Sequence, residues 1–243
     1  MELETGTRAI IALAWARRLG MEDSALASVA LGVDEVRINH RDDAATEATF
    51  VRFMGGSVLS GPAWLLRAAD GIHDEELAAE STLLGLIRAH GDVAARGLGE
   101  SLLYYADQPP VLEESTTTLV SHDPATALEL EALCPRDDLA GVHLAERGKT
   151  FTLVAEEGHA PLAGAGYTVW EGLVADLAVI TAPALRRHGL GTYSAALAAD
   201  DALAEGFVAQ CAADVSNKAA QLMADALGFA LTGSLTRASV GEG

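Results

Sequence analysis

The sequence has few cysteines, and they lie far apart. Cys134 and Cys211 are the only two in 243 residues. A disulfide framework needs several pairable cysteines and a zinc site needs clustered ligands, so the sequence supports neither. We therefore expect reduced thiols, a cytoplasmic protein and no bound metal.

Basic residues are also scarce. The chain has 16 Lys and Arg against 35 Asp and Glu, a formal net charge of −19. Affinity for nucleic acid rests on Lys and Arg that neutralise phosphates, so nucleic acid and anionic membrane surfaces are disfavoured as partners. The acidic field suits an amine-bearing small molecule or a basic peptide, although an acidic surface also serves solubility alone.

Long apolar runs are absent. Half of the residues are hydrophobic, but no run approaches the ~18–20 residues of a membrane span. The first residues, Met1-Glu2-Leu3-Glu4, are acidic where a secretory signal is basic, and the apolar run over residues 9–16 leads into Arg17-Arg18. We therefore expect a globular protein without a membrane span or export signal, which begins with a helix.

Residue periodicity divides the chain into two predicted domains. The first half predicts helices over residues 7–20 and 74–90, a small antiparallel sheet from residues 35–40, 49–54 and 57–60, and a strand over 101–105. Pro109-Pro110 then stops both helix and central strand. We place the boundary there, with an accessory α+β domain over 1–112 and a second domain over 113–243.

The second half predicts a mixed α/β sheet. Helices and turns separate its strands in the order β-α-α-β-β-β-α-β-α-β. The expected strands are residues 116–120, 149–156, 162–170, 173–181, 207–212 and 229–240. The expected helices are 124–133, 192–205 and 217–227, with a short helix or turn over 137–144.

The most informative segment joins the strand ending at Thr181 to the following helix. It contains Pro183 and then Arg186-Arg187-His188-Gly189-Leu190-Gly191. The first amides of a helix lack intrahelical partners and the helix dipole favours negative charge there. Glycine lets the backbone approach a ligand closely, and the arginines add positive charge. The segment therefore predicts a site for a diphosphate-bearing cofactor.

Arg186-x-x-Gly189-x-Gly191 resembles the acyl-CoA turn of the GNAT superfamily of N-acyltransferases. Pro183, three residues before the arginine, and the later Asn217-x-x-Ala220 and Gly228-Phe229 also agree with that family. The resemblance covers about residues 115–241. It implies a GNAT-like fold for 113–243, with an accessory N-terminal domain that resembles a truncated copy of it and caps the acceptor cleft or mediates a homodimer.

The resemblance also implies an activity and a set of cofactor-binding residues. The activity is transfer of an acetyl group from acetyl-CoA to a primary amine of a small molecule or peptide, by direct attack in a ternary complex without a metal. Backbone groups of the central strand would pair with the pantetheine arm, amides of the turn would bind the pyrophosphate, and Asn217 would lie beside the thioester. The residues concerned are Val179, Ile180, Thr181, Arg186, Arg187, His188, Gly189, Leu190, Gly191, Thr192 and Asn217.

The catalytic residues depart from the family pattern, because Ala224 stands where the family commonly has a tyrosine acid. Tyr193 is the candidate replacement or simply a packing residue, and Cys211 and Ser216 are weaker candidates. Asp176 is the candidate base, but strand alternation leaves its face open, since a bulge would switch it. Further candidates, each with an ordinary structural alternative, are Glu171 as base, and Asp137, Asp138, His143, His159 and the tryptophans Trp15, Trp64 and Trp170 around the acceptor.

Two alternatives to the transferase remain. Ala224 also fits a non-catalytic protein that binds or senses acyl-CoA. A dinucleotide-binding α/β enzyme is disfavoured, because the turn lacks the three-glycine spacing and the later acidic ribose ligand.

Overall fold

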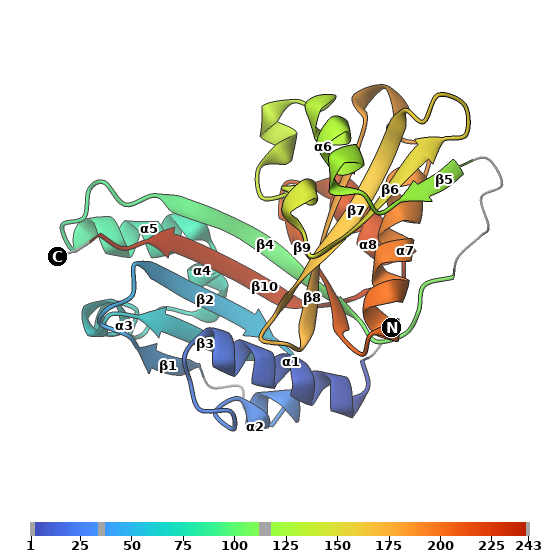
Figure 1. Cartoon of the computed structure of the whole chain (residues 1–243). Coiled ribbons are helices and arrows are strands. Elements are labelled where there is room, and N and C mark those ends of the chain that lie inside the picture. The colour runs from blue at the N-terminus through green and yellow to red at the C-terminus, as the bar shows by residue number, and fades with distance from the viewer. Residues whose placement is uncertain (1–2, 34–36, 112–117, 242–243) are drawn as a thin grey trace. The chain divides into compact units, whose positions relative to one another are not determined.

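The computed structural model describes residues 3–33, 37–111 and 118–241 (Figure 1). Contacts between residues divide the chain into two compact units. The first unit is built from Tyr105–Cys211 and Leu222–Ala230, and the second from Glu4–Tyr104, Ala212–Gln221 and the chain from Leu231 onward. Within the described residues, no helix is long and apolar enough to cross a membrane.

The first unit is a mixed sheet with helices on both faces. Its strand order is β9-β8-β7-β6-β5, antiparallel except for the parallel pair β8–β9. The elements are β5 (Thr118–Ser121), α6 (Pro124–Ala132), the 3-10 helices η1 (Arg136–Leu139) and η2 (Leu144–Glu146), β6 (Lys149–Ala155), β7 (Pro161–Trp170), β8 (Val174–Thr181), the 3-10 helix η3 (Pro183–Leu185), α7 (Leu190–Ala204) and β9 (Val208–Asp214), whose last residues belong to the second unit.

Side-chain alternation along β7 assigns the helices of this unit to opposite faces. A Cβ placed on Gly164 would lie 2.7 Å from Leu144 of η2 and 3.0 Å from Leu130 of α6, so both pack closely on that face. Tyr167, three residues later, donates its hydroxyl to Asp201 of α7 at 2.5 Å. Successive side chains of a strand point to opposite faces, so α6 and η2 cover one face and α7 covers the other.

The second unit is also a sheet with helices on both faces, in the strand order β1-β3-β2-β10-β4. Its elements are α1 (Thr5–Arg18), α2 (Ala27–Ala30), β1 (Ile38–Arg41), β2 (Glu47–Phe53), β3 (Gly56–Gly61), α3 (Ala63–Ala68), α4 (Asp74–Leu77), α5 (Glu80–Ala89), β4 (Gly97–Ala106) and β10 (Ala230–Ser239). The helix α8 (Lys218–Ala226) has residues in both units.

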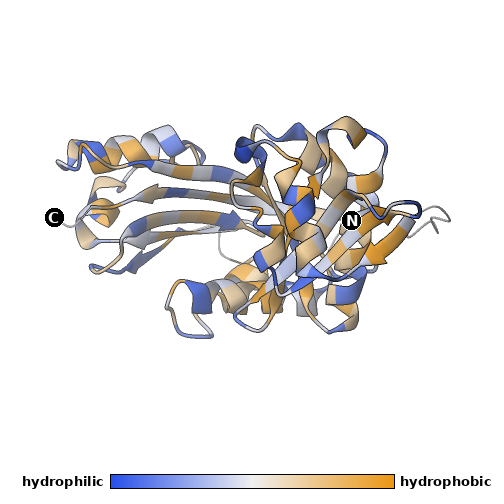
Figure 2. Ribbon diagram, turned by 45° about the horizontal axis from the view of Figure 1, so that its top comes forward, coloured by the Kyte–Doolittle hydropathy of each residue, from blue (hydrophilic) through white to orange (hydrophobic). Residues whose placement is uncertain are grey.

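Two phenylalanines of β2 lie in the core on opposite faces of this sheet. Phe50 belongs to a buried cluster with Leu65 of α3 and Leu83 of α5. Phe53 stacks on Trp15 of α1, with ring centroids 6.3 Å apart. Figure 2 shows hydrophobic residues along the strands and helices and hydrophilic residues at many of the turns. Trp15 is therefore a core residue and does not line a pocket for the acceptor.

The structure confirms the mixed α/β fold and the element order predicted for the second half. Two predictions for the first half are wrong. β1 runs parallel to β3, because alternation along a strand does not determine its direction. The helix predicted over 74–90 is two helices, since the Ala78 carbonyl accepts a hydrogen bond from Thr236 at 2.6 Å and Ala79 is extended. The short helices α2 and α3 were not predicted.

The predicted domain boundary between residues 112 and 113 lies outside the described residues, and it stays a prediction. The starts of the strands predicted over 35–40 and 116–120 also lie outside them. The last strand of the chain, β10, pairs antiparallel with β2 along its length, from Gly233 opposite Phe53 to Ser239 opposite Glu47. The sheet of the second unit therefore combines strands from the first half of the sequence with the last strand.

Substitution of two glycines by alanine should change the stability in opposite directions. Gly85 lies within α5 with open space around its Cβ position, so Gly85→Ala should raise the free energy of unfolding by about 0.5–1 kcal/mol. Gly228 ends α8 at φ 78°, where the Phe229 amide donates to the Ala224 carbonyl. Gly228→Ala should therefore lower the free energy of unfolding by about 1 kcal/mol. Urea unfolding of both variants tests this, and equal signs for the two would contradict it.

Candidate acyl-CoA site

The candidate site begins where β8 and β9 stop pairing. The parallel ladder joins Val174, Ala175 and Asp176 to Val208, Ala209 and Gln210. β8 then continues for five more residues, 177–181, paired with β7 alone among the described residues. Part of a central strand therefore has an edge without a neighbouring strand.

Hydrogen-bond alternation shows which residues of β8 face this open edge. The Ala182 amide donates to the Leu162 carbonyl, next to β7, at 2.9 Å. In an antiparallel pair every second residue bonds to the same neighbour, so the backbone groups of even-numbered residues of β8, including Ile180, point toward β7. On the other edge, Val208 donates to the Leu173 carbonyl at 3.0 Å. The amides of Val179 and Thr181 therefore point toward the side that β9 has left.

The turn after β8 delivers the chain directly to the start of α7. The chain passes through η3, and then Arg187 and Gly189 take left-handed conformations, with φ 68° and 80°. Gly189 is the N-cap of α7, and its carbonyl accepts the first helical hydrogen bond from Tyr193 at 2.9 Å. The amides of Leu190, Gly191 and Thr192 precede that first bond, so they remain available to an anionic ligand.

Gly191 allows this helix start to lie close to β8. A Cβ at Gly191 would approach Thr181 Oγ1 to 2.8 Å and Val179 Cγ1 to 3.6 Å. Gly191 thus lies against the part of β8 that has no partner strand on one side. The residues predicted to hold the pantetheine arm and those predicted to hold the pyrophosphate are therefore neighbours in the first unit.

Arg186 is engaged within the protein. Its guanidinium forms an ion pair with Asp138 of η1 at 2.5 Å, and its Nε donates to the Thr181 carbonyl at 3.4 Å. Arg186 thus ties η1 to the end of β8, and Asp138 is already paired with a cation of this chain. Arg187 and His188 are exposed in the same turn.

Asp176 is the last residue of β8 that pairs with β9, and its side chain forms an ion pair with Arg147 at 3.2 Å. Arg147 also donates to the carbonyls of Gly141, Val142 and Asp176 at 2.9–3.0 Å. The β7–β8 register is unbroken from Trp170–Val174 to Ala163–Thr181, so Asp176 shares the α6 face with Thr168. The structure thus assigns the Asp176 side chain to one face of the sheet, which the sequence alone did not do.

Arg147 and Gln210 are two residues at this site that sequence analysis missed. Gln210 is buried, accepts a hydrogen bond from Trp170 Nε1 and donates one to the Tyr105 hydroxyl, both at 3.0 Å. These contacts hold β9 at the last paired position before the strands diverge. The partners lie 29, 40 and 105 residues away in sequence, so no local pattern could reveal them. Trp170 therefore acts as a structural anchor.

The other proposed catalytic residues have defined local environments. Tyr193 is half-buried in the first turn of α7, and its hydroxyl has no hydrogen-bond partner in the described part of the chain. Asn217 accepts a hydrogen bond from the Ala220 amide at 3.1 Å, so it caps α8. Asn217 belongs to the second unit and Tyr193 to the first. Ala224 is buried, and its methyl side chain has no proton to donate.

The weaker candidates occupy structural positions. Burial raises the pKa of Cys211 to about 12, with a smaller contribution from the charge of Asp176. Ser216 donates its hydroxyl to Asp214 at 2.5 Å. Trp64 stacks on His90, with ring centroids 3.9 Å apart. The exposed residues His143, His159 and Glu171 take left-handed turn conformations, and Asp137 lies in η1. Among the residues described, no group of three or more His, Cys, Asp or Glu is placed to hold a metal ion.

Comparison with known proteins gives a family match for part of the chain. Residues 113–229 match the acetyltransferase (GNAT) family. A comparison with curated proteins gave no match. Among solved structures, a Drosophila protein is 12% identical with a TM-score of 0.52, over 65% of this chain and 55% of that one.

Two other similar structures are GCN5-related N-acetyltransferases. The one from Sphaerobacter thermophilus is 12% identical, with a TM-score of 0.49 over 99% of this chain and 95% of that one. The one from Kribbella flavida is 15% identical, with a TM-score of 0.46 over 94% and 96%. The family match alone supports a GNAT acetyltransferase domain over residues 113–229, and the general activity of that family is acyl transfer from acyl-CoA.

We expect the two cysteines to differ in their rates of alkylation. Burial also raises the pKa of Cys134, which is only half-buried, whereas Cys211 is buried and has a pKa of about 12. Because the thiolate is the reactive form, iodoacetamide at pH 8 should label Cys134 slowly and Cys211 only after denaturation. Mass spectrometry of native protein and of a Cys134→Ser control measures this. Rapid native labelling of Cys211 would contradict it.

Proposed function

We propose that this protein transfers an acetyl group from acetyl-CoA to a primary amine of a small molecule or peptide, by direct attack in a ternary complex. The observation that carries the proposal is the open edge of β8 after Asp176, followed by the glycine turn at the start of α7. An extended pantetheine arm fits an unpaired strand edge, and a pyrophosphate fits unbonded helix amides.

The binding roles divide along the chain. Val179 and Thr181 would pair with the pantetheine arm through their backbone groups. The backbone groups of Ile180 point toward β7 instead, and its side chain is buried. The amides from Arg187 to Thr192 would receive the pyrophosphate, and the exposed Arg187 would add positive charge. Arg186 would act indirectly, because its ion pair with Asp138 supports the wall of the site.

The reaction requires a neutral amine, a stabilised oxyanion and a proton for the thiolate of coenzyme A. The bound thioester supplies the acyl carbon that the amine attacks. Asp176 is the proposed base, and Arg147 keeps its carboxylate oriented on the strand. Tyr193 is the proposed acid, because its hydroxyl has no competing partner among the described residues. Asn217 remains a proposed residue of the thioester end.

A second candidate function is binding or sensing of acyl-CoA without catalysis. Ala224 stands where the family usually has its acid, and the Asp176 carboxylate is already engaged in an ion pair with Arg147. We further propose that the protein is cytoplasmic and forms a homodimer. We also propose that its acidic surface attracts a cationic acceptor.

Release of free thiol from acetyl-CoA in the presence of an amine panel separates the two functions. We predict turnover, with intersecting initial-rate lines for the two substrates. Tyr193→Phe and Asp176→Asn should each lower kcat by about 10²-fold or more. Asp225→Asn, an exposed residue of α8, is the control and should leave kcat unchanged. Tight acetyl-CoA binding without turnover of any amine would favour the sensor.

A substitution at Gly191 tests cofactor binding separately from catalysis. Gly191→Ala should weaken acetyl-CoA binding about tenfold, because its Cβ would collide with Thr181 Oγ1. Thr181→Ala removes that oxygen and keeps the backbone amide, so Gly191→Ala/Thr181→Ala should recover most of the affinity. Calorimetry measures all three variants.

Wild-type affinity in Gly191→Ala would contradict this account of the site. A double variant as weak as Gly191→Ala alone would show that the collision is not the cause. Thermal unfolding of each variant without acetyl-CoA shows whether the first unit remains folded.

A further inference from the structure

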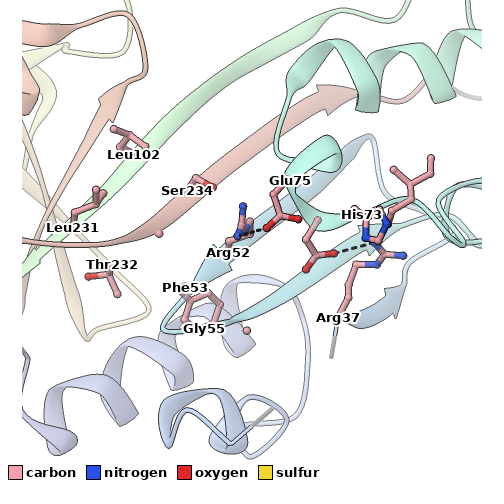
Figure 3. Close-up of a pocket in the computed structure, with 14 residues that line it drawn as sticks. Arg37, Arg52, Phe53, Gly55, His73, Glu75, Leu102, Leu231, Thr232 and Ser234 are labelled. Atoms are coloured by element: carbon pink, nitrogen blue, oxygen red, sulfur yellow. Dashed lines mark hydrogen bonds and ion pairs between the residues drawn. The ribbon is translucent and has the colours of Figure 1, made fainter. Parts of the chain in front are cut away.

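The second unit contains a cavity of about 670 Å³ that the proposed acetyl transfer does not use. Its walls come from the β2–β3 turn at Gly55, the start of α4 at His73, and β10 from Leu231 to Ser234 (Figure 3). None of its lining residues belongs to β8, to the turn of residues 186–191 or to α7. The cavity is therefore a separate candidate for ligand binding.

One of its two arginines is part of the wall. Arg37 donates to the carbonyls of Ala69 and Ile72, both at 2.9 Å, and to Asp74 Oδ1 at 3.0 Å. The other carboxylate oxygen of Asp74 accepts a short hydrogen bond from Ser57. Both oxygens of Asp74 are thus bonded, and the charges of Arg37 and Asp74 balance each other. This group shapes the cavity and leaves little charge for a ligand.

The second arginine, Arg52, is available to a ligand. Its side chain is 37% exposed, and its one hydrogen bond among the described residues is to Glu75, at 3.2 Å. Glu75 itself is 74% exposed, so this ion pair is weak and easily exchanged. Figure 3 shows the two side chains pointing toward each other and joined by this ion pair, Arg52 on β2 and Glu75 on α4.

Ser234 adds a neutral donor beside Arg52. The two residues are directly opposite in the β2–β10 register, so their side chains lie on the same face of the sheet. The Ser234 hydroxyl has no hydrogen-bond partner within the residues described. A planar guanidinium with a neighbouring hydroxyl matches the two oxygens of a carboxylate.

The rest of the lining is apolar on one side. Leu102 of β4 and Leu231 of β10 border the cavity, and Leu231 is 57% exposed. Figure 3 places these leucines beyond Ser234, away from α4. A ligand held at Arg52 by its charged end would therefore reach these leucines with an apolar chain and cover surface that is now exposed to water.

We propose that this cavity binds a small carboxylate with an aliphatic or aromatic tail. The carboxylate takes the place of Glu75 on the Arg52 guanidinium and accepts a hydrogen bond from Ser234, and the tail lies on Leu102 and Leu231. The site is independent of acetyl-CoA, so it would exist in a transferase and in an acyl-CoA sensor alike.

Calorimetry of the full chain with hexanoate, hexanol and hexylamine at 0.15 M salt tests this proposal. These probes share one tail and differ in the head group. We expect one hexanoate per chain and no measurable binding of hexanol or hexylamine. Arg52→Gln should weaken hexanoate binding about tenfold to a hundredfold. The matched control is Arg67→Gln, an exposed arginine of α3 outside the cavity.

Absence of hexanoate binding would overturn the proposal. Equal binding of hexanoate and hexanol, or unchanged binding by Arg52→Gln, would also overturn it, since the arginine would then not recognise the ligand. Gly191→Glu, which should block the acetyl-CoA site, should leave hexanoate binding intact. This variant distinguishes failure of the carboxylate site from failure of the proposed acetyl transfer.

Discussion

The end of the β8–β9 ladder at Asp176 and Gln210 is the constraint on which the candidate site depends. Buried backbone groups nearly always have hydrogen-bond partners, and a strand inside a sheet ordinarily finds them on both sides. Val179 and Thr181 direct their amides to the side that β9 has left. An extended ligand can provide the missing partners. The turn at Gly189 then brings the first amides of α7 to the same end of β8.

Polar contacts, most of them partly buried, lie where that ladder ends. Gln210 is bonded to Trp170 and to Tyr105, and Arg147 holds Asp176 while it binds the carbonyls of residues 141 and 142. A buried polar group is costly unless its partners are in place, so these contacts favour one arrangement of the strands. The same contacts restrain the carboxylate of Asp176 at the end of the ladder.

Much of the first unit could be predicted from the sequence because its signals are local. Alternation along 149–156 and 162–170 predicted the hairpin that β6 and β7 form, and the glycine turn at Gly189 and Gly191 marked the start of α7. The pairing of β10 with β2 joins segments almost two hundred residues apart, and the ion pair of Arg147 with Asp176 joins different elements. Such contacts depend on the assembled sheet. The split of the helix predicted over 74–90 has the same origin, since Thr236 of β10 binds the Ala78 carbonyl.

Hydrogen–deuterium exchange of β8 with and without acetyl-CoA tests the central claim most directly. The amides of Val179 and Thr181 face the open edge, whereas the amide of Ile180 faces β7. We predict that acetyl-CoA slows exchange at Val179 and Thr181 and leaves Ile180, already protected, nearly unchanged. Unchanged exchange at Val179 and Thr181 under saturating acetyl-CoA would contradict the account, because the ligand would then not occupy the edge that β9 leaves open.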